Sequence, residues 1–276
     1  MTDQLSSTKK LASAEKSDSS GAALRAVKSS ERTLHLLEVL SAHPGPVPIT
    51  ELHRLTGYPR SSLHQLLHTM AQSDWIEMSA DGTHAAIGSR ALIVGTSYLD
   101  HDAALRSATA ALERIREETG YTAHYARLNR SEVLYLATRE TTHSRRATSR
   151  VGRSLPAHAT ALGKVLLAER TPQERDEVLS ADPLVQLTPN TISTREALEA
   201  QLDAIDARRW AVEYEENTLG VCCVAAAVPY RIPATDAISC SIPVAHASAE
   251  EIDSVAKVIL AVTNDLARSL QRDGVR

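Results

Sequence analysis

The sequence has 276 residues, 43% of them hydrophobic, and a formal net charge of −4. This length fits two ordinary domains with their own cores, and the net charge excludes a uniformly basic coat for nucleic acids. Aromatic residues make up only 3%, so the cores must be aliphatic. The odd number of three cysteines, with no signal sequence and no apolar run of about 18 residues, predicts a soluble, cytoplasmic protein with no membrane partner.

The first part of the chain predicts a disordered arm followed by two short helices. Residues 1–26 are rich in Ser, Ala, Lys and Asp and contain almost no large apolar side chain, so they cannot offset the entropy of ordering. Leucines then recur with helical spacing between residues 29 and 40. A second helix is expected with Thr50 as its N-cap and Gly57 as its end.

The stretch GYPRSSLHQLL, residues 57–67, opens a third helix with a polar first turn. Asp81-Gly82 lies between two short β-like segments and predicts a tight hairpin. Three helices and a hairpin in this order predict a winged helix-turn-helix over residues 27–88. In that motif the N-terminal end of the third helix enters the major groove of DNA. Candidate contacts to base edges or phosphates are Arg60, Ser61, Ser62, His64 and Gln65.

A structural alternative remains open for this helix, because Ser61 and Ser62 could simply cap a surface helix that binds nothing. The charge of the module also argues against strong DNA binding. Cationic and anionic side chains balance between Leu24 and Arg90, so little affinity would come from counterion release. We therefore expect weak DNA binding by one module, made useful by dimerisation.

The rest of the chain predicts a linker helix over residues 89–103 and an α+β domain over residues 104–272. Strand-like segments occur at residues 121–128, 132–137, 210–215, 221–229 and 237–243. Helical patterns separate them at residues 159–168, 173–179 and 195–207, and a long amphipathic helix closes the chain from residue 249 to about 270. This alternation predicts one mainly antiparallel sheet covered by helices.

Several stretches together resemble the isocitrate-lyase-regulator (IclR) family of bacterial transcription factors. They are VKSSER at 27–32, YPRSSLHQLL at 58–67, RVGRSLPAHATALGK at 150–164, LTPNTI at 187–192 and EYEENTLGVCCVAA at 213–226. The resemblance covers roughly residues 25–272. It implies a winged helix-turn-helix, a GAF-like or profilin-like effector domain, and homodimers or dimers of dimers on palindromic operator DNA. The expected function is repression of a catabolic operon, with activation as the alternative.

The resemblance also implies an effector pocket beside residues 160–163. Its walls map onto Ala147, Leu155, Ala161, Leu162, Glu213, Val221, Cys223, Ser239 and Ser241. Ala161-Leu162 replaces the Gly-Ala pair of some members, which is expected to narrow the floor. Two serines, a thiol and the start of a helix could hold a carboxylate, so the expected effector is a small organic acid, with aromatic acids among the candidates. The basic residues Arg145, Arg146 and Arg150 fit an anionic ligand, as they fit a solvated loop.

Neither a metal nor another cofactor is expected. Cys222 and Cys223 would point to opposite faces of a strand, and the His64/His68 pair lacks the glutamate of an HExxH motif. Ser154 and His158 could be recruited into a hydrolase triad, but no GxSxG elbow is present. A hydrolase and a purely oligomerising adaptor are the alternatives from other classes. Binding of the purified protein to the DNA upstream of its own gene would separate a regulator from the hydrolase and from the adaptor.

Overall fold

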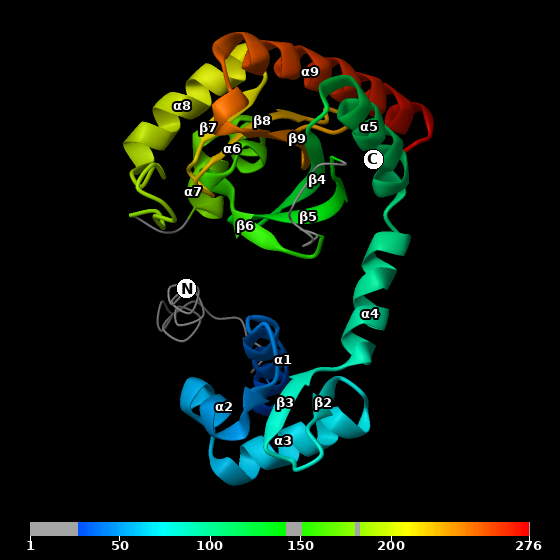
Figure 1. Cartoon of the computed structure of the whole chain (residues 1–276), viewed down its shortest axis with the longest axis vertical. Coiled ribbons are helices and arrows are strands. Elements are labelled where there is room, and N and C mark those ends of the chain that lie inside the picture. The colour runs from blue at the N-terminus through cyan, green and yellow to red at the C-terminus, as the bar shows by residue number, and fades with distance from the viewer. Residues whose placement is uncertain (1–26, 142–150, 180–182, 276) are drawn as a thin grey trace, which may run out of the picture. The chain divides into compact units, whose positions relative to one another are not determined.

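The computed structural model describes residues 27–141, 151–179 and 183–275, and the chain divides after Asp100 into two compact units. Figure 1 labels the helices and strands of both units. The predicted disordered arm, Ala147 and the basic residues around Arg145 lie outside the described residues. Within the described ranges, no helix combines the length and apolar character that a bilayer-spanning segment needs.

The first unit is a winged helix-turn-helix, as predicted. Its elements are α1 (Lys28–Ser41), β1 (Val47–Pro48), α2 (Ile49–Thr56), α3 (Arg60–Gln72), β2 (Ile76–Met78), β3 (His84–Ile87) and α4 (Ser89–Asp100). The strands form an antiparallel sheet in the order β1-β3-β2. Leu36 of α1, Leu52 of α2 and Leu67 of α3 are buried in one core with strand residues, so the three helices are held by aliphatic packing.

The predicted start of α2 is wrong. Thr50 is the second residue of the helix and not its N-cap; Pro48 occupies that position without a side-chain hydrogen bond. The backbone explains the difference, since the N–H of Ile49 donates to the carbonyl of Thr83 at 2.9 Å. Strand β1, which was not predicted, thus runs directly into α2. The predicted end is confirmed, because Gly57 adopts a left-handed conformation with φ of 66°.

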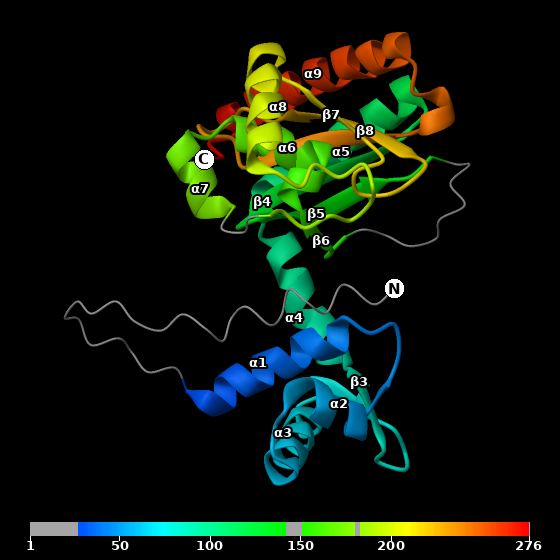
Figure 2. The same ribbon diagram turned by 90° about the vertical axis from the view of Figure 1, so that its left-hand side faces the viewer.

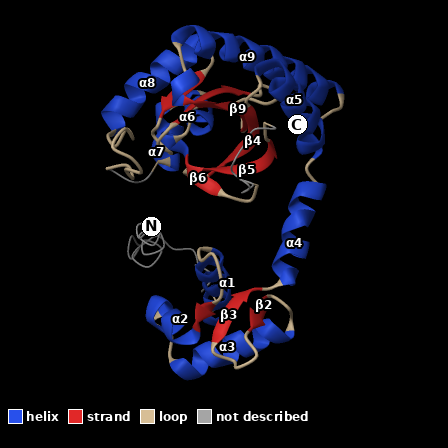
Figure 3. Ribbon diagram, viewed as in Figure 1, coloured by secondary structure: helices blue, strands red, loops and turns tan. Residues whose placement is uncertain are grey.

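The second unit is built around one six-stranded sheet. Its strands are β4 (Thr122–Asn129), β5 (Glu132–Arg139), β6 (Ser154–Pro156), β7 (Ala211–Tyr214), β8 (Val221–Ala227) and β9 (Asp236–Pro243). They lie in the order β6-β5-β4-β9-β8-β7 with every neighbouring pair antiparallel, which confirms the predicted α+β class (Figure 3). The edge strand β6 was not predicted.

Helices cover both faces of this sheet. One face carries α5 (Ala103–Thr119) and α9 (Ala249–Arg272), which pack on each other, as the two views in Figures 1 and 2 show. The other face carries the 3₁₀ turn η2 (Ala157–Ala159), α6 (Ala161–Ala168) and α8 (Arg195–Arg208), while α7 (Pro172–Val178) and η3 (Val244–His246) complete the unit. Because side chains alternate along a strand, Ser239 and Ser241 share the α6 face, and Cys240 faces α5.

Among the described glycines of this unit, Gly163 is the one packed closely against backbone. A Cβ placed there would lie 2.2 Å from the carbonyl oxygen of Ala157 and 2.3 Å from its Cα. These are backbone atoms of η2, so they cannot rotate away as a side chain would. Gly163 therefore allows α6 to pack directly against η2, which sets the position of the helix start at residues 160–162.

We expect Gly163→Ala to destabilise the second unit by about 3 kcal/mol or more, because the methyl group overpacks backbone. Gly95→Ala in α4 is the matched control, since nothing lies within 4 Å of the Cβ there, and it should stabilise its helix by about 0.5–1 kcal/mol. Circular-dichroism melting curves measure both. Equal melting temperatures for Gly163→Ala and the wild type would contradict the packing argument.

Candidate functional site

The first turn of α3 presents polar side chains to solvent while the rest of the helix packs inward. Arg60, Ser61, His64 and Gln65 are exposed, and Leu63 and Leu67 are buried. The helix begins after Pro59 without a side-chain cap, so the two serines do not cap it. Ser62 differs from the other predicted contacts: it is half-buried, and its Oγ accepts a hydrogen bond from Arg32 of α1 at 3.0 Å.

Tyr58 fixes the turn that precedes α3. Its hydroxyl lies 2.7 Å from Nδ1 of His35, and its ring lies under the guanidinium of Arg32, 4.9 Å from ring centroid to Cζ. Its carbonyl oxygen lies 2.6 Å from Nδ1 of His53 on α2. Side chains of α1 and α2 therefore hold the turn that sets the position of α3. This arrangement was not foreseen from the sequence, because α1 and the turn lie far apart along the chain.

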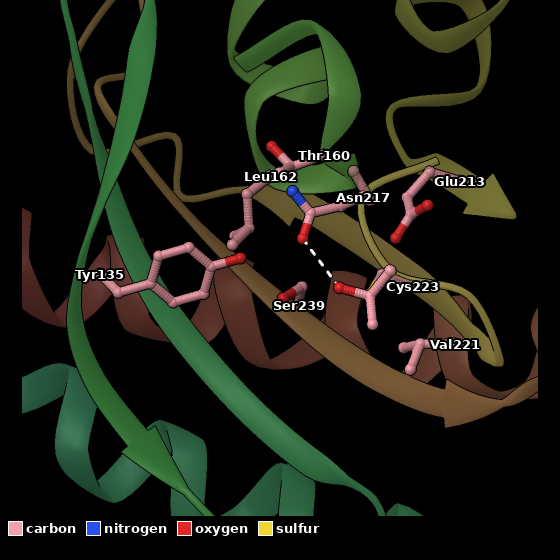
Figure 4. Close-up of a pocket in the computed structure, with 10 residues that line it drawn as sticks. Tyr135, Thr160, Leu162, Glu213, Asn217, Val221, Cys223 and Ser239 are labelled. Atoms are coloured by element: carbon pink, nitrogen blue, oxygen red, sulfur yellow. Dashed lines mark hydrogen bonds between the residues drawn. The ribbon is translucent and has the colours of Figure 1, made fainter. Parts of the chain in front are cut away.

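A small cavity lies in the second unit between α6 and the sheet. It is lined by Tyr135, Thr160, Ala161, Leu162, Glu213, Asn217, Thr218, Val221, Cys223 and Ser239. Figure 4 shows the Tyr135 hydroxyl, the Ser239 side chain and Leu162 converging on the same space. About 10 Å³ is free for the centre of a water molecule, which is room for about one water.

Six predicted pocket residues line this cavity together: Ala161, Leu162, Glu213, Val221, Cys223 and Ser239. Leu155 instead packs against the neighbouring core. Ser241 is also outside the lining, with its Oγ 3.6 Å from Sγ of Cys223. Ala147 falls outside the described residues.

Three lining residues were missed: Tyr135, Asn217 and Thr218. Tyr135 comes from β5, and the sequence holds no signal that this strand, rather than another, would face α6. Asn217 and Thr218 lie in the stretch quoted for the family resemblance, and Thr218 donates a hydrogen bond to Oδ1 of Asn217 at 3.0 Å. A turn-forming Asn-Thr pair directly before a strand that carries Val221 and Cys223 was the available signal.

The start of α6 borders the cavity. Thr160 is the N-cap of this helix, and its Oγ1 accepts a hydrogen bond from the N–H of Gly163 at 3.0 Å. Ala161 and Leu162 occupy the first turn, where backbone N–H groups and the helix dipole favour negative charge. Because Leu162 is 1% exposed and lines the cavity, its side chain limits the space in front of this turn. The expected narrowing of the floor is consistent with that position.

A buried group of charges adjoins the cavity. Lys164 and Glu216 form an ion pair, and Lys164 Nζ also donates to Oε1 of Gln201 at 2.7 Å. Glu213 is 2% exposed and accepts a hydrogen bond from the N–H of Glu216 at 2.9 Å. Burial raises the pKa of Glu213 to about 7, with the nearby Glu216 carboxylate acting in the same direction.

His158 and Ser154, which were considered for a hydrolase triad, lie in different surroundings. His158 is buried, its Nε2 lies 2.8 Å from the carbonyl of Val185, and desolvation lowers its pKa. Ser154 is exposed on the edge strand β6. In the described parts of the chain, no cluster of three or more His, Cys, Asp or Glu side chains could hold a metal ion.

Both halves of the chain match family models. Residues 29–79 match the IclR helix-turn-helix domain, and residues 96–268 match the C-terminal domain of the bacterial transcriptional regulator IclR. The chain belongs to the IclR family. Its members are transcriptional regulators and not enzymes, and the recognised resemblance is confirmed.

Curated relatives and solved structures agree with this assignment. The transcriptional repressor IclR of Escherichia coli is 30% identical over 244 residues, which cover 87% of this chain and 89% of the relative. The regulator XynR of the same organism is 32% identical over 202 residues, which cover 73% of this chain and 80% of the relative. A regulator from Alicyclobacillus acidocaldarius has a TM-score of 0.76 at 21% identity, covering 88% of this chain and 99% of its own. An IclR homologue from Microbacterium hydrocarbonoxydans, solved with 4-hydroxybenzoate, has a TM-score of 0.71 at 23% identity, covering 87% and 99%.

The position of Glu213 yields a stability prediction. A carboxyl whose pKa is raised from 4.5 to about 7 by folding stabilises the protein only while it is protonated. Stability is therefore lost as the pH rises from 4.5 through 7. Glu213→Gln keeps an acceptor for the Glu216 N–H and removes this loss, so the variant should be more stable than the wild type by about 3 kcal/mol above pH 7.

Urea unfolding between pH 4.5 and pH 8 measures this difference, which should vanish at the acidic end. Glu196→Gln in the exposed first turn of α8 is the control and should leave the pH profile unchanged. If the difference in free energy of unfolding between the wild type and Glu213→Gln is the same at both ends of the pH range, folding does not raise the pKa of Glu213.

Proposed function

We propose that this protein is a cytoplasmic transcriptional repressor of a catabolic operon whose operator binding is modulated by a small organic acid. The family assignment supports DNA binding, and several relatives are named as repressors. The exposed polar first turn of α3, carried on a buried aliphatic face, is the observation that supports Arg60, Ser61, His64 and Gln65 as the DNA contacts. Ser62, whose hydroxyl accepts a hydrogen bond from Arg32, would then position Arg32 as well as contact DNA.

The effector proposal is supported by what lines the cavity. The hydroxyl group of Ser239 and the first turn of α6 offer hydrogen-bond donors to a carboxylate. Tyr135 adds an aromatic wall, which would suit an aromatic acid, and a structural relative was solved with 4-hydroxybenzoate. Because the cavity has room for about one water, an acid of that size requires Leu162 to move. The effector-bound state must therefore differ from this one near the start of α6.

A chain of ion pairs supports coupling between the sheet and the end of the linker. Arg127 of β4 donates to Asp236 of β9 at 2.6 Å and pairs with Asp102 at 2.6 Å. Asp102 is the N-cap of α5, the first helix after α4. Ser239 lies three residues from Asp236 on the same strand, so a shift of β9 at the cavity would act on the residue at which α5 begins.

Homodimers, alone or in pairs, are part of the proposal. Leu92, Ile93, Val94 and Tyr98 of α4 are 47–70% exposed, and the helix has no buried residue. Such an apolar surface on a helix with no buried residue fits a second copy of the same helix. Dimerisation would also give two recognition helices, as a palindromic operator requires.

We expect Arg60→Ala to reduce the affinity for duplex DNA by about 1–3 kcal/mol if the guanidinium contacts a base. The probe is a duplex selected from a random pool by the wild-type protein, and fluorescence anisotropy measures binding. A phosphate contact would instead weaken binding to all sequences and reduce the salt dependence. Arg268→Ala on α9, 69% exposed at its side chain, is the control. Unchanged binding by Arg60→Ala would remove this residue from the interface.

Substitution of Leu92 and Ile93 by Asp should shift the protein from dimers to monomers, because charges would be buried between apolar helices. Analytical ultracentrifugation measures the change, and affinity for the selected duplex should fall with it. Gln271→Asp, exposed on α9, should do neither. A double variant that remains dimeric would place the interface elsewhere.

The effector site is tested by a thermal-shift screen of small organic and aromatic acids, including 4-hydroxybenzoate, followed by DNA release with the acids that stabilise the protein. Ser239→Ala should weaken the response about 10-fold or more, since a hydrogen bond to a charged group is lost. Ser241→Ala is the matched control, because Ser241 contacts Cys223 but does not itself line the cavity. If both variants respond as the wild type does, the effector binds at another site.

A further inference from the structure

The charges beside the cavity do not balance. Glu213, Glu216 and Lys164 are 2%, 5% and 0% exposed, so water screens none of them effectively. Lys164 donates to Oε1 of Glu216, while Oε2 of Glu216 accepts the N–H of Ile192 at 3.2 Å. The single ammonium is thus matched by Glu216. When all three groups are ionised, Glu213 leaves one net negative charge at the cavity wall.

The groups that face Glu213 come from three elements. Lys164 of α6 favours its anion, Glu216 after β7 opposes it, and Cys223 of β8 donates a weak hydrogen bond. His158 of η2 acts on Lys164 and Glu216, and its lowered pKa keeps it neutral near pH 7. In the described part of the chain, Lys164 is therefore the cation that stabilises ionised Glu213. Lys164 is already paired with Glu216.

An acidic effector in this cavity would bring a second negative charge next to Glu213. Two carboxylates that share a buried site cannot both remain ionised; one takes up a proton and donates it to the other. Glu213 is the group suited to hold that proton, because its carboxylate neighbour Glu216 is fixed by the ammonium of Lys164 and by the N–H of Ile192. The proton comes from solvent, and no covalent bond between heavy atoms changes.

We propose that Glu213 binds the acidic effector as a carboxylic acid, so that each effector anion enters the pocket together with one proton. The inference rests on the proposed function and adds the protonation state in which the pocket recognises an acid. It makes Glu213 a specificity residue: the protonated carboxyl donates to a carboxylate, whereas an ionised one would select hydroxyl or ammonium donors. The raised pKa of free Glu213, about 7, means that little free energy is needed to protonate it near neutrality.

The test counts protons during binding by isothermal titration calorimetry of the full chain. The probes are 4-hydroxybenzoate and pyruvate, with 4-hydroxybenzamide as the neutral isostere, in buffers of different ionisation enthalpy at pH 6, 7 and 8. Uptake should rise from near zero at pH 6 to nearly one proton at pH 8. The affinity for the acid should fall about tenfold per pH unit above 7, while that for the amide should not.

Glu213→Gln should bind the acid with no proton uptake and no dependence on pH, because the amide is a permanent neutral donor. Glu196→Gln should behave as the wild type. Acid binding by the wild type without proton uptake would overturn the inference and leave the proposed effector intact. Uptake that persists in Glu213→Gln would assign the proton to another group. If neither acid binds even at pH 6 while the amide does, the acidic effector itself is wrong, and binding of none of the probes at any pH would count against it in the same way.

Discussion

The buried ion pair between Lys164 and Glu216 joins elements of the second unit beside the cavity. It joins α6 to the segment that follows β7, and the hydrogen bond from Lys164 to Gln201 adds α8. A buried charge that loses its partner destabilises a protein by about 3–5 kcal/mol, so these three elements are constrained to stay together. The cavity lies against this junction, with Leu162 on one side and Glu213 on the other. Its geometry and its charge are thus set by the same pair.

The same constraint explains why the cavity is polar but nearly closed. Gly163 lets α6 approach η2 closely, which presses Leu162 toward the sheet and leaves room for about one water. Under the proposed function, an effector therefore displaces a packed side chain, and part of the free energy of its binding moves the start of α6. On the other face of the sheet, Asp236 is bound by Arg127, Tyr125 and Tyr230. Through Arg127, that network connects β9 to Asp102 at the beginning of α5.

Local patterns in the sequence predicted what depends on neighbours along the chain. The helices and the hairpin of the first unit, the antiparallel sheet and the shared face of Ser239 and Ser241 all follow from periodicity. The family resemblance supplied Glu213 and Cys223 as pocket residues. Long-range placement was out of reach: Tyr135 faces the cavity because of the order of strands, and Thr50 fails as a cap because Thr83 satisfies the backbone of Ile49. Lys164 passed unnoticed as one residue in a motif, although it is as fully buried as Asp236.

Reciprocity between the two ligands tests the central claim, that an acid in this cavity controls DNA binding. Linkage requires that if the acid lowers the affinity for operator DNA by some factor, DNA must lower the affinity for the acid by the same factor. The measurement is calorimetric titration of the full chain with the acid that releases it from DNA, in the absence and in the presence of a saturating selected duplex. The account predicts equal factors in the two directions, greater than one. An affinity for the acid that is the same with and without DNA would contradict it.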